Sequence, residues 1–241
     1  MIVTVDVGLK NLAFCIMECE NPKELSTYNI KLWNVYNTLE TPVYLCKGIL
    51  KSGKTCGKRC LYKYQNGELE LEYTCKLHFP KSQIIKSNNH YKQKRVDEYL
   101  LQDITKIVLT KMNSIFEENS DLFDKVTKVL IELQPKINNK MKLISHLIYS
   151  KFVELFINNP KTTIRFVRAA QKLKAYKGPI IMCNLKGAYA RRKYLSIQYT
   201  KWFLNNKFSK EEKEKWLDVF LSNNKQDDLG DVFLMAINGF N

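Results

Sequence analysis

Four carboxylates lie in or beside apolar runs that are expected to form regular elements. Asp6 terminates the apolar run IVTVD at residues 2–6, and Glu132 lies in the otherwise apolar run VLIELQ. Further along the chain, Asp228 and Asp231 are three residues apart, a spacing that places both on one face of a helix. Because a buried carboxylate is costly unless it is paired or binds a metal, these side chains need partners. We expect the four to converge on two Mg²⁺ or Mn²⁺ ions, which prefer oxygen ligands.

Some of these carboxylates also have a plainer interpretation, whereas Glu132, within a strand, has no routine structural role. Asp6 could be a turn residue at a strand end, and either Asp227 or Asp228 could cap the last helix, a role we assign to Asp227. The complete set favours chemistry, because paired divalent ions can activate water and stabilise the leaving oxygen in phosphodiester cleavage. Other catalytic schemes fit less well, since the sequence has no P-loop, no G-x-G-x-x-G, no G-x-S-x-G and only three histidines.

A second group of candidate ligands is local. Cys46, Cys56, Cys60, Cys75 and His78 lie within 33 residues of a hydrophilic, lysine-rich stretch that offers little core in which thiols could simply be buried. Zinc in structural sites takes four N or S ligands, so one cysteine is spare. The Cys-x-x-His pair of TCKLHF supplies two ligands. We prefer Cys46 and Cys56 as the others, because CKGILKSGKTC contains a glycine hairpin, with Cys60 as the alternative. Four protein ligands would make the zinc structural.

Charge predicts a polyanionic partner. The net charge is +15, from 39 Lys and Arg against 24 Asp and Glu. Residues 155–210 contain thirteen cations, interleaved with aromatics, and no acidic residue, a mixture that suits a phosphate backbone and exposed bases. A solvated basic face or an anionic membrane patch is the alternative. DNA is favoured because the cations are spread over several predicted elements, and we expect these residues to contact it: Lys10, Asn11, Lys136, Lys140, Lys172, Lys174, Arg191, Arg192 and Lys193.

The class of protein follows from the remaining composition. No apolar run reaches the roughly 18 residues of a membrane span, so we expect no membrane association. The start, MIVTVDVGLKN, does not have the pattern of a signal peptide, which predicts an intracellular setting where the seven cysteines are thiols or metal ligands. We expect one nuclease domain over residues 1–241, with an inserted zinc-binding module at 41–82.

Periodicity predicts an α/β chain. The order of apolar runs around the expected insertion is strand, strand, strand, then helix, strand, helix, strand and further helices. A strand, helix, strand sequence implies parallel pairing of its two strands. The predicted strands cover 2–6, 12–17, 29–37, 128–135 and 162–167, and the predicted helices cover 91–118, 141–157, 188–204, 209–221 and a last helix that starts near 227.

Three segments, taken in this order, resemble a known family. VDVGLKNLAF, IELQP and DDLGDVFLMAI are similar to motifs of the poxvirus-type, RuvC-like Holliday junction resolvases of the RNase H-like superfamily. The resemblance implies an RNase H-like mixed sheet flanked by helices. It also implies catalytic carboxylates at Asp6, Glu132, Asp228 and Asp231, and Mg²⁺-dependent, symmetric nicking of four-way DNA junctions by a homodimer. A viral enzyme of this kind would process recombination and replication intermediates where viral DNA replicates.

Two points stay open at the level of sequence. A minimal resolvase does not need the cysteine-rich insertion, which either contacts DNA or caps a sheet edge; its candidate contacts are Lys47, Lys51, Lys54, Lys58 and Arg59. RNase H-like proteins also cut other substrates, so a nuclease acting on flaps or hybrids is an alternative. A catalytically inactive, zinc-stabilised nucleic-acid-binding adaptor is another. Intact carboxylates at all four positions favour the enzyme.

Overall fold

The computed structural model describes residues 1–241 apart from 40–43, 67–69, 92–97, 135–137 and 241. The chain divides into two compact units, which we call the core unit, Met1–Leu39 with Leu100–Asn241, and the inserted unit, Glu40–Tyr99. The inserted unit therefore extends beyond the predicted 41–82, because Tyr91 N–H donates to Leu61 O and His90 forms a bridge with Tyr62.

The core unit is built on one five-stranded mixed sheet, as predicted. The strands lie in the order β3-β2-β1-β6-β7. β1 and β2 form the expected antiparallel hairpin, β3 continues it, and β6 pairs in parallel with both β1 and β7. β6 ends at Glu132, short of the predicted 135. The strand bounds are β1 Ile2–Asp6, β2 Asn11–Cys19, β3 Tyr28–Asn37, β6 Lys128–Glu132 and β7 Thr163–Val167.

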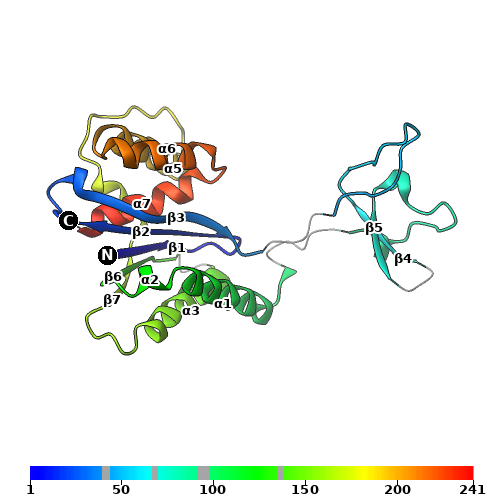
Figure 1. Ribbon diagram of the computed structural model, residues 1–241, viewed down its shortest axis with the longest axis horizontal. Helices are drawn as coiled ribbons and strands as arrows, with labels where there is room; N and C mark the ends of the chain where they lie inside the picture. Colours follow the sequence, from blue (N-terminus) through cyan, green and yellow to red (C-terminus); the bar gives the residue numbers. More distant parts are fainter. Residues whose placement is uncertain (40–43, 67–69, 92–97, 135–137, 241) are drawn as a thin grey trace. The chain divides into compact units, whose positions relative to one another are not determined.

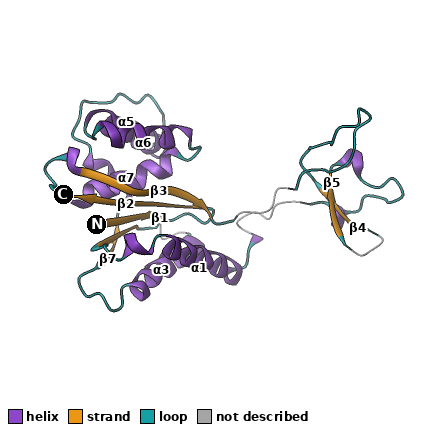
Figure 2. Ribbon diagram, viewed as in Figure 1, coloured by secondary structure: helices purple, strands orange, loops and turns teal. Residues whose placement is uncertain are grey.

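Helices cover both faces of this sheet (Figure 1). On one face lie α1 (Leu101–Glu118), the short α2 (Ser120–Phe123) and α3 (Asn139–Leu155). On the other lies α7 (Gln226–Phe240), with α5 (Ala188–Asn206) and α6 (Lys210–Ser222) outside it (Figure 2). α1 begins ten residues later than the predicted 91, since Tyr91 belongs to the inserted unit. Among the described residues, no helix has the length and apolar character needed to cross a membrane.

Helix α7 is held on the sheet by burial and by two polar contacts. Nine of its fifteen residues are buried. Thr4 Oγ1 of β1 donates to Val232 O at 2.7 Å, and Trp33 Nε1 of β3 donates to Leu229 O at 3.0 Å. These bonds use carbonyls of the same helix turns that carry Asp228 and Asp231. The packing that buries α7 therefore also fixes where its carboxylates lie.

The inserted unit has little apolar interior. It contains the two-stranded antiparallel sheet β4 (Tyr62–Gln65) and β5 (Leu71–Thr74) and two short 3₁₀ helices, Lys76–His78 and Ser87–Asn89. Its buried cluster consists of Cys46, Cys60 and Cys75. Leu45, Ile49, Leu77 and Ile84 are all more than half exposed. A unit of this size with so small a core is only marginally stable by itself, and a metal or disulfides commonly add the missing stability.

Candidate active site and candidate metal centre

Three carboxylates from distant parts of the chain meet at the carboxyl end of the central strands. β1 and β6 pair in parallel with Val5 opposite Ile131, so Asp6 and Glu132 are neighbours at the same edge of the sheet. Asp231 reaches them from α7. One carboxylate oxygen from each of Asp6, Glu132 and Asp231 lies within 4.8 Å of the others. The structure thus brings together three of the four residues predicted to form one site.

Lys172 lies inside this acidic group. Its ammonium donates to Glu132 Oε2 at 3.0 Å and to Asp231 Oδ2, and the residue is 5% exposed. We predicted Lys172 as a DNA contact, but its ammonium is buried and is paired with two carboxylates. The cause is topological: α4 (Ala169–Lys172) follows β7 almost directly, and β7 is parallel to β6, so α4 starts at the same edge of the sheet as the carboxylates.

The position of Asp231 is supported by helix α5. Ser196 Oγ donates to Asp231 Oδ1 at 2.6 Å. The two helices come close because residue 230 is glycine; a Cβ there would lie 2.8 Å from Ser196 Oγ. Sequence reasoning missed both Ser196 and the role of Lys172. The position of Lys172 just after a parallel strand was an available signal, whereas nothing in the sequence singled out Ser196.

Burial and mutual repulsion shape the electrostatics of the group. Burial, and then the negative charge of Glu132, raise the pKa of Asp6 well above its ordinary value. Burial also raises the pKa of Asp231, although Lys172 acts in the opposite direction. Burial tends to lower the pKa of Lys172, but the charges of Asp231, Glu132 and Asp6 outweigh it and leave that pKa raised. The site therefore favours a positive charge among its carboxylates.

Asp228 and Asp227 have different places on α7. Asp228 lines the same cavity without joining the close group of three, and burial together with the charge of Asp227 raises its pKa to about 6. Asp227 lies within the first turn of α7, which begins at Gln226, and its carboxylate pairs with Lys193. The prediction that Asp227 is the helix cap was therefore wrong.

The carboxylates open into a cavity of about 330 Å³ with a basic rim. Its lining includes Asp6, Glu132, Gln134, Lys172, Tyr189, Arg192, Lys193, Asp228 and Asp231. Arg192 and Lys193 extend into it from the start of α5, so two of the predicted DNA contacts lie beside the acidic group. A cavity with an acidic floor and a basic rim suits a divalent cation together with a phosphate group.

The other predicted DNA contacts are placed elsewhere in the core unit. Lys10 and Asn11 lie in the turn and strand that follow Asp6 but do not line the cavity, and Arg191 is exposed in the first turn of α5. Lys140 lies in the first turn of α3, and Lys174 lines a neighbouring cavity. Lys136 lies outside the described residues.

The inserted unit gathers the second predicted group of ligands. The ligand atoms of Cys46, Cys56, Cys75 and His78 lie within 4.8 Å of one another, and Cys60 is not part of this group. His78 Nδ1 is 3.4 Å from the Sγ atoms of both Cys46 and Cys75, and Cys56 Sγ is 3.8 Å from Cys75 Sγ. These are the four residues that the sequence favoured, with the spare cysteine outside.

The imidazole of His78 is held in one orientation. Its Nε2 lies 3.1 Å from Ile49 O, which leaves Nδ1 directed at the thiols. Gly48 makes this approach possible, since a Cβ at that position would lie 2.3 Å from His78 Cγ. A histidine whose second nitrogen binds a backbone carbonyl is the usual arrangement of a metal ligand.

The chain is similar in sequence to a viral protein and in structure to viral resolvases. No protein family matches the sequence. The chain is 28% identical, over 88% of its length, to "Uncharacterized protein L451" of Acanthamoeba polyphaga mimivirus, and it spans about half of that protein, 54%. Among solved structures it is similar to a fowlpox virus resolvase in complex with its substrate Holliday junction DNA, at a TM-score of 0.45 and 14% identity, covering 99% of this chain and 95% of that one. A second structure, the fowlpox virus Holliday junction resolvase, gives a TM-score of 0.42 and 13% identity, with 99% and 97% covered.

Proposed function

We propose that the core unit is a metal-dependent endonuclease that cuts four-way DNA junctions, a Holliday junction resolvase. The observation that carries the proposal is the convergence of Asp6, Glu132 and Asp231, with Asp228 in the same cavity, beneath the cations Arg192 and Lys193. The choice of a junction as substrate rests on the sequence resemblance of the motifs that contain these carboxylates to poxvirus-type resolvases.

The donor set fits Mg²⁺ or Mn²⁺. All donors in the group of three are carboxylate oxygens, which suit hard divalent cations, and we propose that Asp6, Glu132 and Asp231, with Asp228 beside them, hold two such ions. When bound, ions of this kind polarise a phosphodiester and make water a better nucleophile. A cation would also offset the burial and the repulsion from Glu132 that together raise the pKa of Asp6.

The remaining residues position the reacting groups. Lys172 holds the carboxylates of Glu132 and Asp231 in place by charge-assisted hydrogen bonds, and Ser196 orients the second oxygen of Asp231. Arg192 and Lys193 bind the phosphates of the strand to be cut. The ammonium of Lys193, which lines the same cavity as the carboxylates, can also stabilise negative charge that develops on the phosphate oxygens during cleavage.

Symmetric nicking requires two such sites. A four-way junction presents two equivalent strands, and a two-fold homodimer supplies one site for each in matching positions. We therefore propose that the chain acts as a homodimer. Its place of action, the site of viral DNA replication in an infected cell, stays a prediction.

In the inserted unit, we propose that Cys46, Cys56, Cys75 and His78 bind a structural Zn²⁺. Three thiols and one imidazole are a complete zinc-binding set, and all four donors come from protein, so no position is left for a substrate. The scarcity of buried apolar side chains in this unit supports a metal as its main source of stability.

One cleavage experiment tests the nuclease. The full chain is incubated with a four-way junction, a flap, an RNA–DNA hybrid and a linear duplex, each with Mg²⁺, Mn²⁺ or a chelator. We expect paired, symmetric nicks in the junction that require the metal and are lost in Asp231→Asn. Asp218→Asn, an exposed acidic residue of α6, should cleave normally.

The outcomes separate the alternatives. Equal cleavage of all four substrates would remove the junction preference and leave a general nuclease. Binding without cleavage in either metal would favour the inactive adaptor. Normal cleavage by Asp231→Asn would overturn the assigned active site.

A further inference from the structure

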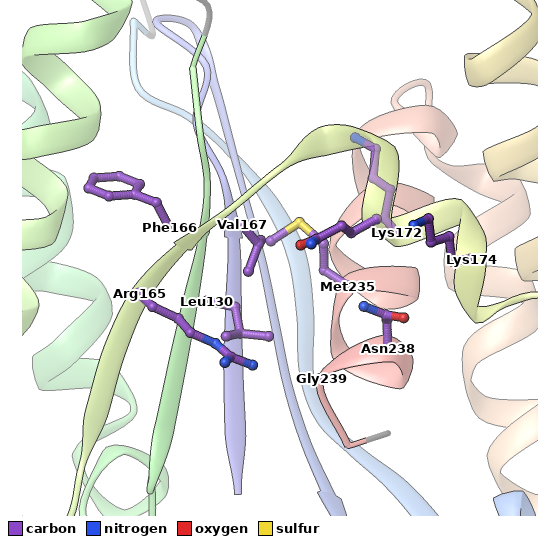
Figure 3. A pocket seen from close by; sticks show the side chains of 10 residues that line it. Leu130, Arg165, Phe166, Val167, Lys172, Lys174, Met235, Asn238 and Gly239 are labelled. Atoms are coloured by element: carbon purple, nitrogen blue, oxygen red, sulfur yellow. The ribbon is translucent and has the colours of Figure 1, made fainter.

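A second cavity lies on the face of the sheet that α7 partly covers (Figure 3). It shares one lining residue, Lys172, with the acidic site. It has a volume of about 360 Å³. Leu130 of β6 packs on Met235 of α7, and Arg165 of β7 is the register partner of Leu130, so Arg165 projects from this same face. Asn238 approaches from the last turns of α7, as the close view shows. The cavity is therefore an uncovered part of the sheet between α7 and the edge strand β7.

The lining of this cavity is basic. It contains the cations Arg165, Lys172 and Lys174 and the amides of Gln171 and Asn238, and no described residue that lines it is acidic. Lys172 is already paired with two carboxylates, and its ammonium points away from Arg165 in the close view. Arg165 and Lys174 are exposed, and among the described residues neither has an ion-pair partner.

The floor and one wall of the cavity are apolar. Leu130, Val167 and Met235 line it beneath the polar groups. Phe166 belongs to the lining too, but its ring stacks on Tyr149 of α3, with centroids 5.2 Å apart. Among the described residues that line the cavity, none therefore offers a free aromatic face for a base to stack on. The groups that remain for a ligand are cations and amides, which are donors for an anion.

We propose that this cavity binds a backbone phosphate of the DNA strand that is being cut, a few nucleotides from the scissile bond. The proposal rests on the nuclease function proposed above. Lys172 of α4 lines both cavities, so they adjoin at this helix and one strand could reach from one to the other. Arg165 provides the planar fork that matches two phosphate oxygens, and Lys174 provides a point charge.

Such a phosphate contact would set the register of the strand. Contacts to phosphates position nucleic acid without reading its sequence. A strand held at a fixed distance from the carboxylates presents one phosphodiester to them, which converts loose association into an oriented complex. The cavity would therefore determine which bond is cut relative to the junction centre.

Salt-dependent binding tests the proposal. Binding of a four-way junction to the full chain is measured in chelator between 50 and 200 mM salt, with Arg165→Gln, Lys174→Gln and the control Lys161→Gln, an exposed lysine of the same acid-free segment that does not line the cavity. Affinity falls as salt rises, and each lost phosphate contact makes the slope of log affinity against log salt shallower by about 0.9. We expect that change of slope, with roughly tenfold weaker binding at low salt, in the two cavity variants only.

Three outcomes separate this proposal from the nuclease. An unchanged slope in both cavity variants, with normal binding by the unsubstituted chain, would overturn the phosphate site alone. An equal change of the salt dependence in Lys161→Gln would also overturn the phosphate site, because the loss of net charge would then explain the effect. Failure of the unsubstituted chain to bind DNA would overturn the proposed function itself. Both cavity side chains are exposed, so unchanged thermal unfolding should accompany each variant.

Discussion

The two candidate metal centres are assembled in opposite ways. The carboxylates come from positions 6, 132 and 231, and they meet only because β1, β6 and α7 pack together. The thiols and imidazole of the inserted unit come from a stretch of 33 residues and meet around a single hairpin and a 3₁₀ helix. The first centre depends on the whole core fold. In the second, the fold of the unit would depend on the centre.

The two centres also differ in what surrounds their ligands. The carboxylates have Lys172 and Ser196 as partners and open into a cavity with a basic rim. The Cys46 thiol lies 3.6 Å from Thr74 Oγ1, and His78 is fixed by Ile49 O. Oxygen donors beside an open cavity suit exchange of ions and substrate, whereas four protein donors suit permanent binding.

The largest expected effect comes from removing one carboxylate charge. We predict that Asp6→Asn lowers the cleavage rate by on the order of 10³-fold or more, because one ligand of the divalent ions is lost. Thermal stability without divalent ions should be retained, since the change removes a buried negative charge beside Glu132. Single-turnover cleavage measures the expected loss of rate, and thermal unfolding measures the expected retention of stability.

A large loss of stability in Asp6→Asn would show that the acidic group supports the fold, so that the two centres would not differ in this respect. Junction binding in chelator should remain close to that of the unsubstituted chain. Asp218→Asn again serves as the charge-matched control.

The next effect concerns the inserted unit. We predict that Cys75→Ser abolishes stoichiometric zinc binding and makes residues 40–99 sensitive to proteases, because metal binding supplies the folding free energy of small units of this kind. Cys60→Ser is the matched control, since Cys60 is equally buried but lies outside the group of four. Metal analysis and limited proteolysis of the full chain measure both properties.

The core unit should unfold thermally at an unchanged temperature in Cys75→Ser. If Cys60→Ser lost zinc and Cys75→Ser retained it, Cys60 would be the zinc ligand and Cys75 the spare cysteine. Loss of core stability would mean that the inserted unit is not an independent folding unit.

Sequence reasoning predicted the local centre more completely than the remote one. Cys46, Cys56, Cys75 and His78 were chosen from their spacing and from the glycine hairpin alone, and the structure gathers the same four. For the remote centre, three signals indicated the carboxylates: Asp6 at a strand end, Glu132 within an otherwise apolar strand, and the i, i+3 spacing in α7. They could not show that Asp228 lies apart from the close group of three, since helix rotation about its axis is set by tertiary packing.

The errors have the same physical origin. Lys172 and Asp227 were interpreted from their residue type and their position along the chain. Both have partners that are remote in sequence: Lys172 pairs with Glu132 and Asp231, and Asp227 pairs with Lys193. The mixed sheet and its parallel pairing were predicted correctly, because alternation of strands and helices restricts the topology strongly. Helix α1 was predicted to start too early, since its apolar periodicity continues into a segment that belongs to the inserted unit.

A moderate effect is expected from the support of Asp231. We predict that Ser196→Ala weakens the apparent affinity for Mg²⁺ in cleavage by about 10- to 100-fold, as is typical when a partner that orients a metal ligand is removed. The rate at saturating Mg²⁺ should recover most of its value. Ser145→Ala is the control, because Ser145 is also buried, on α3, and donates to Lys142 O. A defect that saturating Mg²⁺ does not relieve would assign Ser196 a role beyond orienting the ligand.

The smallest effects should come from two glycines that the units need for different reasons. Gly230→Ala would place a Cβ 2.8 Å from Ser196 Oγ and 3.0 Å from Thr200 Oγ1, so α5 must shift, and we predict that the core unit loses on the order of 1 kcal/mol of stability. In the inserted unit, a Cβ at Gly53 meets nothing within 4 Å, but its φ of +78° is strained for alanine.

Gly53→Ala should therefore destabilise the hairpin by about 1 kcal/mol without disturbing any packing contact. Tryptophan fluorescence follows thermal unfolding of the core unit in Gly230→Ala, because all three tryptophans lie in that unit. Competition for zinc by a chelator measures the effect of Gly53→Ala on the inserted unit. Gly230→Ala should also weaken the apparent affinity for Mg²⁺ in cleavage, because a shift of α5 moves Ser196 away from Asp231, whereas Gly53→Ala should leave cleavage unchanged. A Gly230→Ala variant with normal Mg²⁺ dependence and lowered stability would show that the carboxylate site tolerates movement of the helix that supports it.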